Sequence, residues 1–271
     1  MKNTNKVIQG LWIGGELSTM EQLSIQSFLQ NGHEYHLYTY QPVQNVPEGT
    51  IVKDGREVLS SDRIFTYQSG FGKGSYAGFA DLFRFHLLHK KGGWWVDTDV
   101  ICLKPFDFEA DSVIASSYEG EWGNCANICV LKLVQKSELT TELVTRCDSL
   151  DPAQVGYGDT GSILLQRLLP ELSHPQNIAS PETFCPISWR AVNKIVRPDS
   201  VLTPQTFVKA VKDQIRPIVR PHTNPGRVTH KSYALHLWNE IWRQNQIDKN
   251  ATYSANCWYE RLKRRYSISP A

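Results

Sequence analysis

The sequence predicts an α/β fold with parallel strands, and three observations support this prediction. Residues 7–40 follow a strand–helix–strand pattern, which implies two parallel strands joined by a right-handed crossover. Residues 75–91 have the apolar periodicity of a long helix, and an apolar strand over 94–100 follows it at once. Two more runs typical of strands are present over 112–118 and 126–133. A chain of 271 residues is long enough to enclose these elements in one large core.

Each element of the opening unit has its own justification. Residues 7–13 form an apolar run, residues 18–31 place apolar side chains near one stripe, and residues 34–40 alternate in polarity. Ser18 stands before the helix with Glu21 three residues later, which is the spacing of a capping box. This unit is therefore expected to form a strand, a helix and a second strand.

The rest of the chain is expected to be richer in loops. Residues 41–74 contain many prolines, glycines and polar groups, with one short strand over 56–59. Ser75 is expected to cap the helix over 75–91, and Gly92 to end it. Helices are predicted over 137–149, 159–169, 204–214 and 254–265, and a late strand over 233–238. No internal repeat or linker divides the chain, so we expect a single domain.

Composition excludes several classes of protein. The formal net charge of +2 argues against a dedicated nucleic-acid binder, which would be clearly basic. No run reaches the roughly 18 apolar residues of a membrane span, and the polar start is unlike a signal peptide. None of the six cysteines forms a C-x-x-C pair, so no zinc site is expected. We expect reduced thiols in a cytoplasmic protein.

Two carboxylates stand out at the end of the strand over 94–100. Side chains alternate along a strand, so Asp97 and Asp99 are expected to point the same way. Like charges on one side repel unless a cation lies between them, and oxygen ligands suit a hard divalent ion such as Mg²⁺ or Mn²⁺. Such an ion takes its remaining ligands from water or phosphate. The sequence therefore predicts a metal–diphosphate site near Thr98.

A second charged pair lies on the preceding helix. Asp81 and Arg84 are three residues apart and share a helix face. A surface ion pair of roughly 0.3–0.5 kcal/mol is the plainer interpretation. The neighbouring side chains are apolar, however, and the helix leads directly into the strand that carries Asp97 and Asp99. We therefore expect the pair to belong to the same site.

The chain resembles the glycosyltransferases whose sugar-binding region contains a DXD motif, family 32, with the related family 8 and clostridial-toxin enzymes. The resemblance rests on the pattern Ser75-x-Ala77-x-x-Ala80-Asp81-x-x-Arg84, followed by Gly92-Gly93-x-Trp95-x-Asp97-x-Asp99. The opening Leu11-Trp12-Ile13-Gly14 also resembles the first strand of these enzymes. Two departures are Ala80, where serine is common, and Trp95, where tyrosine is common.

The resemblance implies a GT-A fold, which is a Rossmann-like α/β sandwich with a mixed, mostly parallel central sheet flanked by helices. Residues 1–271 would form a single GT-A catalytic domain. Its nucleotide-sugar-binding part would span about 1–135, and its acceptor-binding part and C-terminal helix about 136–271. The implied activity is metal-dependent transfer from a nucleotide sugar to a glycan, a lipid-linked glycan or another hydroxyl acceptor, in polysaccharide or glycan biosynthesis. A UDP-sugar is the favoured donor and a GDP-sugar the alternative.

The resemblance also implies roles for individual residues. Asp99 would bind the ion, Mn²⁺ or Mg²⁺, directly, and Asp97 would contact the donor and reach the ion through water. Asp81 and Arg84 would hold the hydroxyls of the donor sugar. The base pocket would be lined by Trp12, Ile13 and Gly14, and the expected donor-binding set is completed by Thr98, Gly158, Thr160 and Trp238. Retention of anomeric configuration is implied, and a same-face attack is the simpler hypothesis because no carboxylate nucleophile is evident.

Two later segments are weaker candidates. Gly158-Asp159-Thr160-Gly161 resembles a Thr-Gly element that faces the sugars, with Asp159 as a catalytic candidate, although Asp159 or Thr160 would equally suit a helix cap. His236 stands where related enzymes have a metal-binding or diphosphate-binding histidine, although a lone histidine on a strand is more often structural. The basic helix over 254–265 is typical of a solvated face, with contact to diphosphate or to the inner membrane surface as alternatives.

Three other interpretations compete with a glycosyltransferase. A haloacid-dehalogenase-like phosphatase also uses Asp-x-Asp after an apolar strand, but that strand is normally the first of its fold. A calcium loop of the EF-hand type needs glycine at its sixth position, where this chain has Cys102. A carbohydrate-binding protein that has lost turnover is the third alternative, and the intact carboxylates argue against it.

Overall fold

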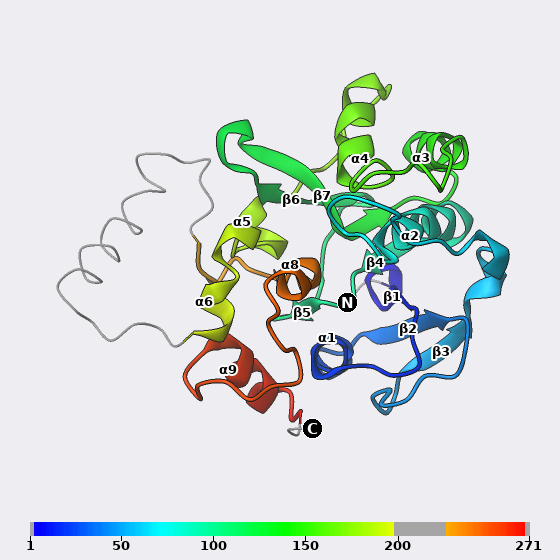
Figure 1. The fold of residues 1–271 in the computed structure, drawn as a ribbon. Coiled ribbons are helices and arrows are strands. Elements are labelled where there is room, and N and C mark those ends of the chain that lie inside the picture. The colour runs from blue at the N-terminus through cyan, green and yellow to red at the C-terminus, as the bar shows by residue number, and fades with distance from the viewer. Residues whose placement is uncertain (1–2, 198–225, 269–271) are drawn as a thin grey trace.

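The computed structural model describes residues 3–197 and 226–268, and its centre is a six-stranded sheet (Figure 1). The strand order is β3-β2-β1-β4-β7-β6, and only β7 runs against its neighbours. The strands are β1 (Val7–Trp12), β2 (Glu34–Thr39), β3 (Ile51–Asp54), β4 (Gly93–Val96), β6 (Val113–Tyr118) and β7 (Asn124–Leu133). This mixed, mostly parallel sheet with flanking helices confirms the predicted fold class.

Helices and loops cover both faces of the sheet. The helices are α1 (Thr19–Gln30), α2 (Ala77–Lys91), α3 (Glu138–Asp148), α4 (Ser162–Leu168), α5 (Pro181–Phe184), α6 (Asn193–Val196), α8 (Asn239–Gln244) and α9 (Trp258–Arg265). Figure 1 shows α2, α3 and α4 grouped on one side of the sheet and α1 on the other. Because side chains alternate along β4, Trp95 packs with Phe83 of α2, while Trp94 packs toward Phe106 on the opposite face. Each tryptophan therefore anchors one of the two core layers.

A separate two-stranded sheet connects the last third of the chain to the centre. Strands β5 (Val100–Cys102) and β8 (Ala234–His236) pair antiparallel, with Val100 opposite His236. Because β5 begins one residue after Asp99, this pairing places His236 beside the DXD motif. This pairing therefore joins a segment of the last third of the chain to the segment that follows the DXD motif.

The sequence signals at the helix ends are largely confirmed. Ser18 and Glu21 form the expected capping box on α1. The N-cap of α2 is Tyr76, without a side-chain bond, and not Ser75 as expected, but the Ser75 hydroxyl still accepts a hydrogen bond from the Ala77 N–H at 3.1 Å. Gly92 ends α2 with a φ of 65°, and a Cβ there would lie 2.8 Å from the Gln135 backbone nitrogen. Glycine is therefore required at this helix–strand junction.

Some boundaries differ from the prediction. The strand expected over 56–59 is wrong, because residues 55–57 form a 3-10 helix that Asp54 caps by accepting from the Arg56 N–H. The edge strand of the sheet is β3, which ends at Asp54, before the predicted range begins. The helix expected over 159–169 begins only at Ser162, and the helix expected over 254–265 begins at Trp258. The helix predicted over 204–214 lies outside the described residues.

The basic residues of α9 are largely engaged within the protein. Lys263 lies 2.6 Å from Glu260 and is buried, Arg265 donates to the Leu103 carbonyl, and Arg264 donates to the Ala255 carbonyl. Within the described parts of the chain, no helix combines the length and apolar character needed to cross a bilayer.

Candidate active site

The DXD motif forms a turn between β4 and β5. The predicted strand over 94–100 is wrong in this respect, because β4 ends at Val96 and the Val100 N–H donates to the Asp97 carbonyl at 3.1 Å. The Asp97 N–H donates to the Cys129 carbonyl at 2.9 Å, which ties the turn to β7. The two carboxylates are therefore brought together by a turn and its neighbours, and not by the alternation of a strand.

Asp97 is held from the side of α2. Its Oδ1 accepts from the Trp95 indole at 2.8 Å and lies 3.0 Å from Arg84 Nη2. The same Nη2 lies 3.1 Å from Asp81 Oδ1, and Arg84 Nη1 donates to the Ile128 carbonyl at 2.6 Å. Arg84 is 4% exposed. The surface-pair interpretation is therefore wrong, and Arg84 is a buried bridge that fixes two carboxylates at once.

Asp99 is held from the side of the last strand. Its Oδ2 accepts from the Asn239 N–H at 2.7 Å and lies 3.2 Å from His236 Nε2. The backbone carbonyl of Asp99 also accepts from the Leu237 N–H at 2.9 Å. Residues 236–239 therefore fix Asp99 through two contacts to its carboxylate and one to its backbone carbonyl.

The two carboxylates have opposite electrostatic environments. Burial raises the pKa of Asp97, and the charge of Arg84 opposes this shift without cancelling it. Burial also acts to raise the pKa of Asp99, but the charge and hydrogen bonds of His236 outweigh it and leave the pKa lowered. In turn, Asp99 raises the pKa of His236 against the effect of burial. Without a cation, the imidazolium of His236 is the positive charge that compensates Asp99.

These three residues have the arrangement of a metal site. One ligand atom from each of Asp97, Asp99 and His236 lies within 4.8 Å of the other two. Two carboxylates and an imidazole suit a divalent ion such as Mn²⁺. The sequence prediction grouped the same three residues, and the structure brings them together.

The Thr-Gly segment also reaches the site. Thr160 Oγ1 donates to Asp81 Oδ2 at 3.2 Å, and a Cβ on Gly161 would lie 2.5 Å from the same oxygen. Burial raises the pKa of Asp81 to about 7, although Arg84 acts against it. Thr160 does not cap α4, whose N-cap is Gly161 without a side-chain bond. Sequence reasoning missed the role of Gly161, which lies directly against Asp81.

Asp159 is placed differently from its neighbour. Its Oδ2 accepts from the Gly156 N–H at 2.9 Å, so it closes an exposed turn and does not cap α4. The structure does not group Asp159 with Asp97, Asp99 and His236. Its catalytic role stays a prediction.

The remaining predicted residues line the same edge of the sheet. Trp12 ends β1, and Ile13 and Gly14 follow it, at the carboxyl ends of the parallel strands beside the end of β4; all three residues are half-buried. Thr98 lies between the two carboxylates of the turn and is half-buried. Gly158 has a φ of 90°, which lets the chain turn before Thr160. The placement agrees with a donor site at this edge, and the roles of these residues stay predictions.

Trp238 packs on the metal-site histidine. Its ring centroid lies 4.0 Å from that of His236, with planes at 34°, and its indole donates to the Ile187 carbonyl at 2.8 Å. Trp238 has a left-handed backbone, with φ 64° and ψ 55°. Such a conformation is costly for a bulky residue, which indicates that the tryptophan is held there by its contacts.

Tyr157 was not among the predicted site residues. Although the residue is 46% exposed overall, partial burial raises its pKa, and the charges of Asp81, Glu240 and Asp99 add to the shift. Its ring packs edge-on to Phe71 at 4.7 Å. The only sequence signal was its place between two glycines.

Two family models match the sequence. Residues 19–119 match the glycosyltransferase sugar-binding region containing a DXD motif, and residues 164–268 match the conserved region of alpha 1,4-glycosyltransferases. The first match contains Asp97 and Asp99 and the second contains His236. The resemblance derived from the sequence is therefore confirmed. No curated protein matches the chain.

Among solved structures, the chain is similar to the PaToxG glycosyltransferase at 15% identity, with a TM-score of 0.47 over 85% of this chain and 88% of that one. It is similar to the apo form of the glycosyltransferase GlyE of Streptococcus pneumoniae at 13% identity, with a TM-score of 0.48 over 98% of this chain and 60% of GlyE. A second GlyE structure matches at 14% identity, with a TM-score of 0.48 over 98% and 61%. The chain thus spans about three fifths of GlyE. All three TM-scores lie below 0.5.

Proposed function

We propose that the chain is a glycosyltransferase that transfers a sugar from a nucleotide-sugar donor to a hydroxyl acceptor with a divalent cation at Asp97, Asp99 and His236, and the two glycosyltransferase family models that match it support this proposal. The observation that supports the cation is the convergence of these three ligand atoms within 4.8 Å. The combination of two hard carboxylates with an imidazole favours Mn²⁺ over Mg²⁺. A cation bound there would neutralise the diphosphate leaving group as a Lewis acid.

The protein side chains have separate tasks in this proposal. Arg84 orients Asp97 and Asp81, so each carboxylate presents an oxygen in a fixed direction. Asn239 and His236 do the same for Asp99. Asp81, backed by Thr160, would accept hydrogen bonds from hydroxyls of the donor sugar. This division of labour is the preorganisation that stabilises charge as the glycosidic bond breaks.

The finer specificity rests on the resemblance. A UDP-sugar is the favoured donor, with its base against Trp12 and Ile13, and a GDP-sugar is the alternative. The acceptor would be a glycan or a lipid-linked glycan in polysaccharide or glycan biosynthesis, and the location cytoplasmic. We do not extend the proposal to a membrane contact through α9, because Lys263, Arg264 and Arg265 bond within the protein.

The stereochemical course is a separate proposal. We expect the anomeric configuration of the donor sugar to be retained. The acceptor hydroxyl would attack on the same face of the sugar from which the leaving group departs. An NMR assignment of the anomeric configuration of the product tests it, and an inverted product would contradict it.

The first experiment is to measure release of nucleoside diphosphate from a panel of UDP- and GDP-sugars, with Mn²⁺ or with chelator. Turnover of one donor is expected only with the metal, and it should be lost in Asp99→Ala. Asp111→Ala, which removes an exposed carboxylate on a loop, is the matched control and should keep turnover. If no donor is turned over, calorimetry on the same panel must still show metal-assisted binding. Absence of both would overturn the proposal, and binding without turnover would favour the carbohydrate-binding alternative.

A further inference from the structure

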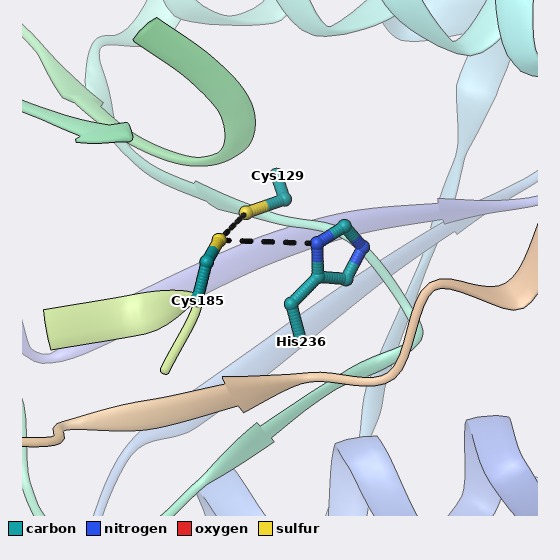
Figure 2. A group of neighbouring side chains, drawn as sticks. All are labelled: Cys129, Cys185 and His236. Carbon is teal, nitrogen blue, oxygen red and sulfur yellow. Dashed lines mark hydrogen bonds between the residues drawn. The ribbon is translucent and has the colours of Figure 1, made fainter. Parts of the chain in front are cut away.

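A second cluster of ligand atoms shares His236 with the first (Figure 2). It consists of Cys129 on β7, Cys185 just after α5, and His236 at the end of β8. Their exposed fractions are 1%, 0% and 7%. The three residues come from segments that are far apart in the sequence, so their meeting is a product of the fold.

The spacing of the ligand atoms matches a metal site. The two Sγ atoms are 3.6 Å apart, and Cys185 Sγ lies 4.0 Å from His236 Nδ1. All three ligand atoms lie within 4.8 Å of one another. Two sulfurs bound tetrahedrally to one Zn²⁺ at about 2.3 Å would be about 3.8 Å apart. The thiol pair therefore has nearly the separation that a shared zinc ion would impose.

The donor set is chemically different from that of the DXD site. Two sulfurs and an imidazole select soft or borderline cations, whereas two carboxylates and an imidazole also suit Mg²⁺ and Mn²⁺. His236 already has the outer partner that zinc-binding histidines have, because its other nitrogen, Nε2, lies 3.2 Å from Asp99. The cluster thus has its ligands and part of its supporting shell.

We propose that Cys129, Cys185 and His236 form a second metal site, selective for Zn²⁺ over Mn²⁺, whose occupation withdraws His236 from the DXD site. On binding, the two thiols and the Nδ1–H of the His236 imidazolium release three protons to solvent, and the two thiolates balance the charge of the ion. No oxidant or reductant takes part.

The competition follows from the two nitrogens of one ring. When Nδ1 binds zinc, Nε2 carries the proton and donates it to Asp99. When Nε2 binds the cation of the DXD site, Nδ1 carries the proton and faces Cys185. A neutral imidazole cannot serve as ligand on both sides at once. The protein would therefore hold Mn²⁺ more weakly when zinc is bound.

The site itself is tested with Cd²⁺, whose thiolate complexes absorb in the ultraviolet. The full chain is kept reduced with a phosphine and titrated with Cd²⁺. One equivalent should give a thiolate-to-cadmium band, and Zn²⁺ should remove it. The band should be lost in Cys129→Ser and in Cys185→Ser. Cys257→Ser is the matched control, because Cys257 is equally buried but caps α9, where serine is a good substitute.

Two outcomes would overturn the soft-metal site. One is a wild-type chain that gives no band, and the other is a band that persists when both Cys129 and Cys185 are serine. If the serine variants do not fold, X-ray absorption of the zinc-loaded wild type decides the question. A shell with two sulfurs and one imidazole is expected, and a shell of oxygens alone would refute the proposal.

The competition between the two metal sites is tested by measuring the concentration of free Mn²⁺ with electron paramagnetic resonance. One equivalent of Cd²⁺ should weaken Mn²⁺ binding about tenfold in the wild type, because loss of a supporting contact or ligand costs 10- to 100-fold in metal affinity. The same addition should have no such effect in Cys185→Ser. The Mn²⁺ measurement rests on the proposed function, because it requires Mn²⁺ to bind at the DXD site. The cadmium band does not depend on that function, so the two experiments can fail separately. A normal band without any change in Mn²⁺ affinity would refute the coupling alone.

Discussion

At the scale of single residues, Arg84 is the residue on which most of the site depends. Its guanidinium contacts two carboxylates and a backbone carbonyl, and it lies 4.9 Å from the ring of Trp95. An arginine can make these contacts together because its planar fork has five donors. The sequence predicted the Asp81–Arg84 pair, but the link to Asp97 could only come from the fold.

Arg84→Met should destabilise the protein by about 3–5 kcal/mol, because the buried carboxylate of Asp81 and the half-buried carboxylate of Asp97 lose their compensating charge. Urea unfolding monitored by circular dichroism measures the change in free energy. Arg146→Met is the control, since Arg146 forms its ion pair with Glu171 at the exposed surface. That variant should change the free energy of unfolding by less than about 1 kcal/mol. Equal losses in both variants would contradict the bridging role.

Gly161→Ala should lower kcat/KM for the donor by about 10- to 100-fold, because the new Cβ would displace the Asp81 carboxylate. Steady-state kinetics with the donor found in the panel provides the measurement. Gly15→Ala is the control for stability, since its Cβ would meet only Gln41 at 3.9 Å. Unchanged kinetics in Gly161→Ala would show that Asp81 has room to move.

Tyr35→Phe should be neutral or stabilising. The hydroxyl of Tyr35 is buried and has no hydrogen-bond partner among the described residues, so its removal ends a desolvation penalty. Tyr259→Phe is the matched control, because that buried hydroxyl donates to the Lys249 carbonyl at 2.6 Å. Thermal unfolding should show a loss of about 1 kcal/mol for Tyr259→Phe and none for Tyr35→Phe. A larger loss of stability in Tyr35→Phe than in Tyr259→Phe would show that the Tyr35 hydroxyl makes a stabilising hydrogen bond, and would contradict this prediction.

At the scale of elements, local patterns predicted the existence of the strands and helices better than their ends. The capping box at Ser18 is a local device, so the start of α1 was predictable. The end of β4 is not local, because it depends on the bond from Asp97 to Cys129 on β7, a strand that follows later in the chain. The prediction of one continuous strand over 94–100 failed for this reason.

Ser18→Ala should cost about 1 kcal/mol, since the capping box satisfies backbone donors at the start of α1. Chemical denaturation provides the measurement. Ser18→Asp should keep most of the stability, because aspartate is an equally good N-cap. A loss in Ser18→Asp as large as in Ser18→Ala would indicate a role other than capping.

At the scale of the whole molecule, the candidate site is a convergence of distant segments. Asp97 and Asp99 could be predicted from the sequence because they stand in one motif, whereas the only signal for His236 was a resemblance. The approach of Cys129 and Cys185 had no signal at all, because neither is part of a spaced motif. Long-range packing of this kind is decided by tertiary contacts that periodicity does not contain.

Binding of Mn²⁺ should stabilise the folded protein as a whole. At a free concentration 100 times the dissociation constant, the free energy of unfolding should rise by about 2.7 kcal/mol, and chelator should reverse the effect. Differential scanning fluorimetry follows the midpoint with and without the metal. Asp99→Asn should abolish the shift, whereas Asp111→Asn should retain it. A shift that survives in Asp99→Asn would place the ion elsewhere.

The pairing of β5 with β8 has a consequence for biosynthesis. Asp99 accepts from Asn239, a residue 140 positions later, and His236 lies directly opposite Val100. During translation, the carboxylates emerge long before the histidine that completes their cation site. A ribosome-bound chain that ends before β8 would therefore be unable to hold the ion with three protein ligands. If two separately expressed halves were combined, split between α3 and α4, recovery of Mn²⁺ binding would report directly on the docking of β8.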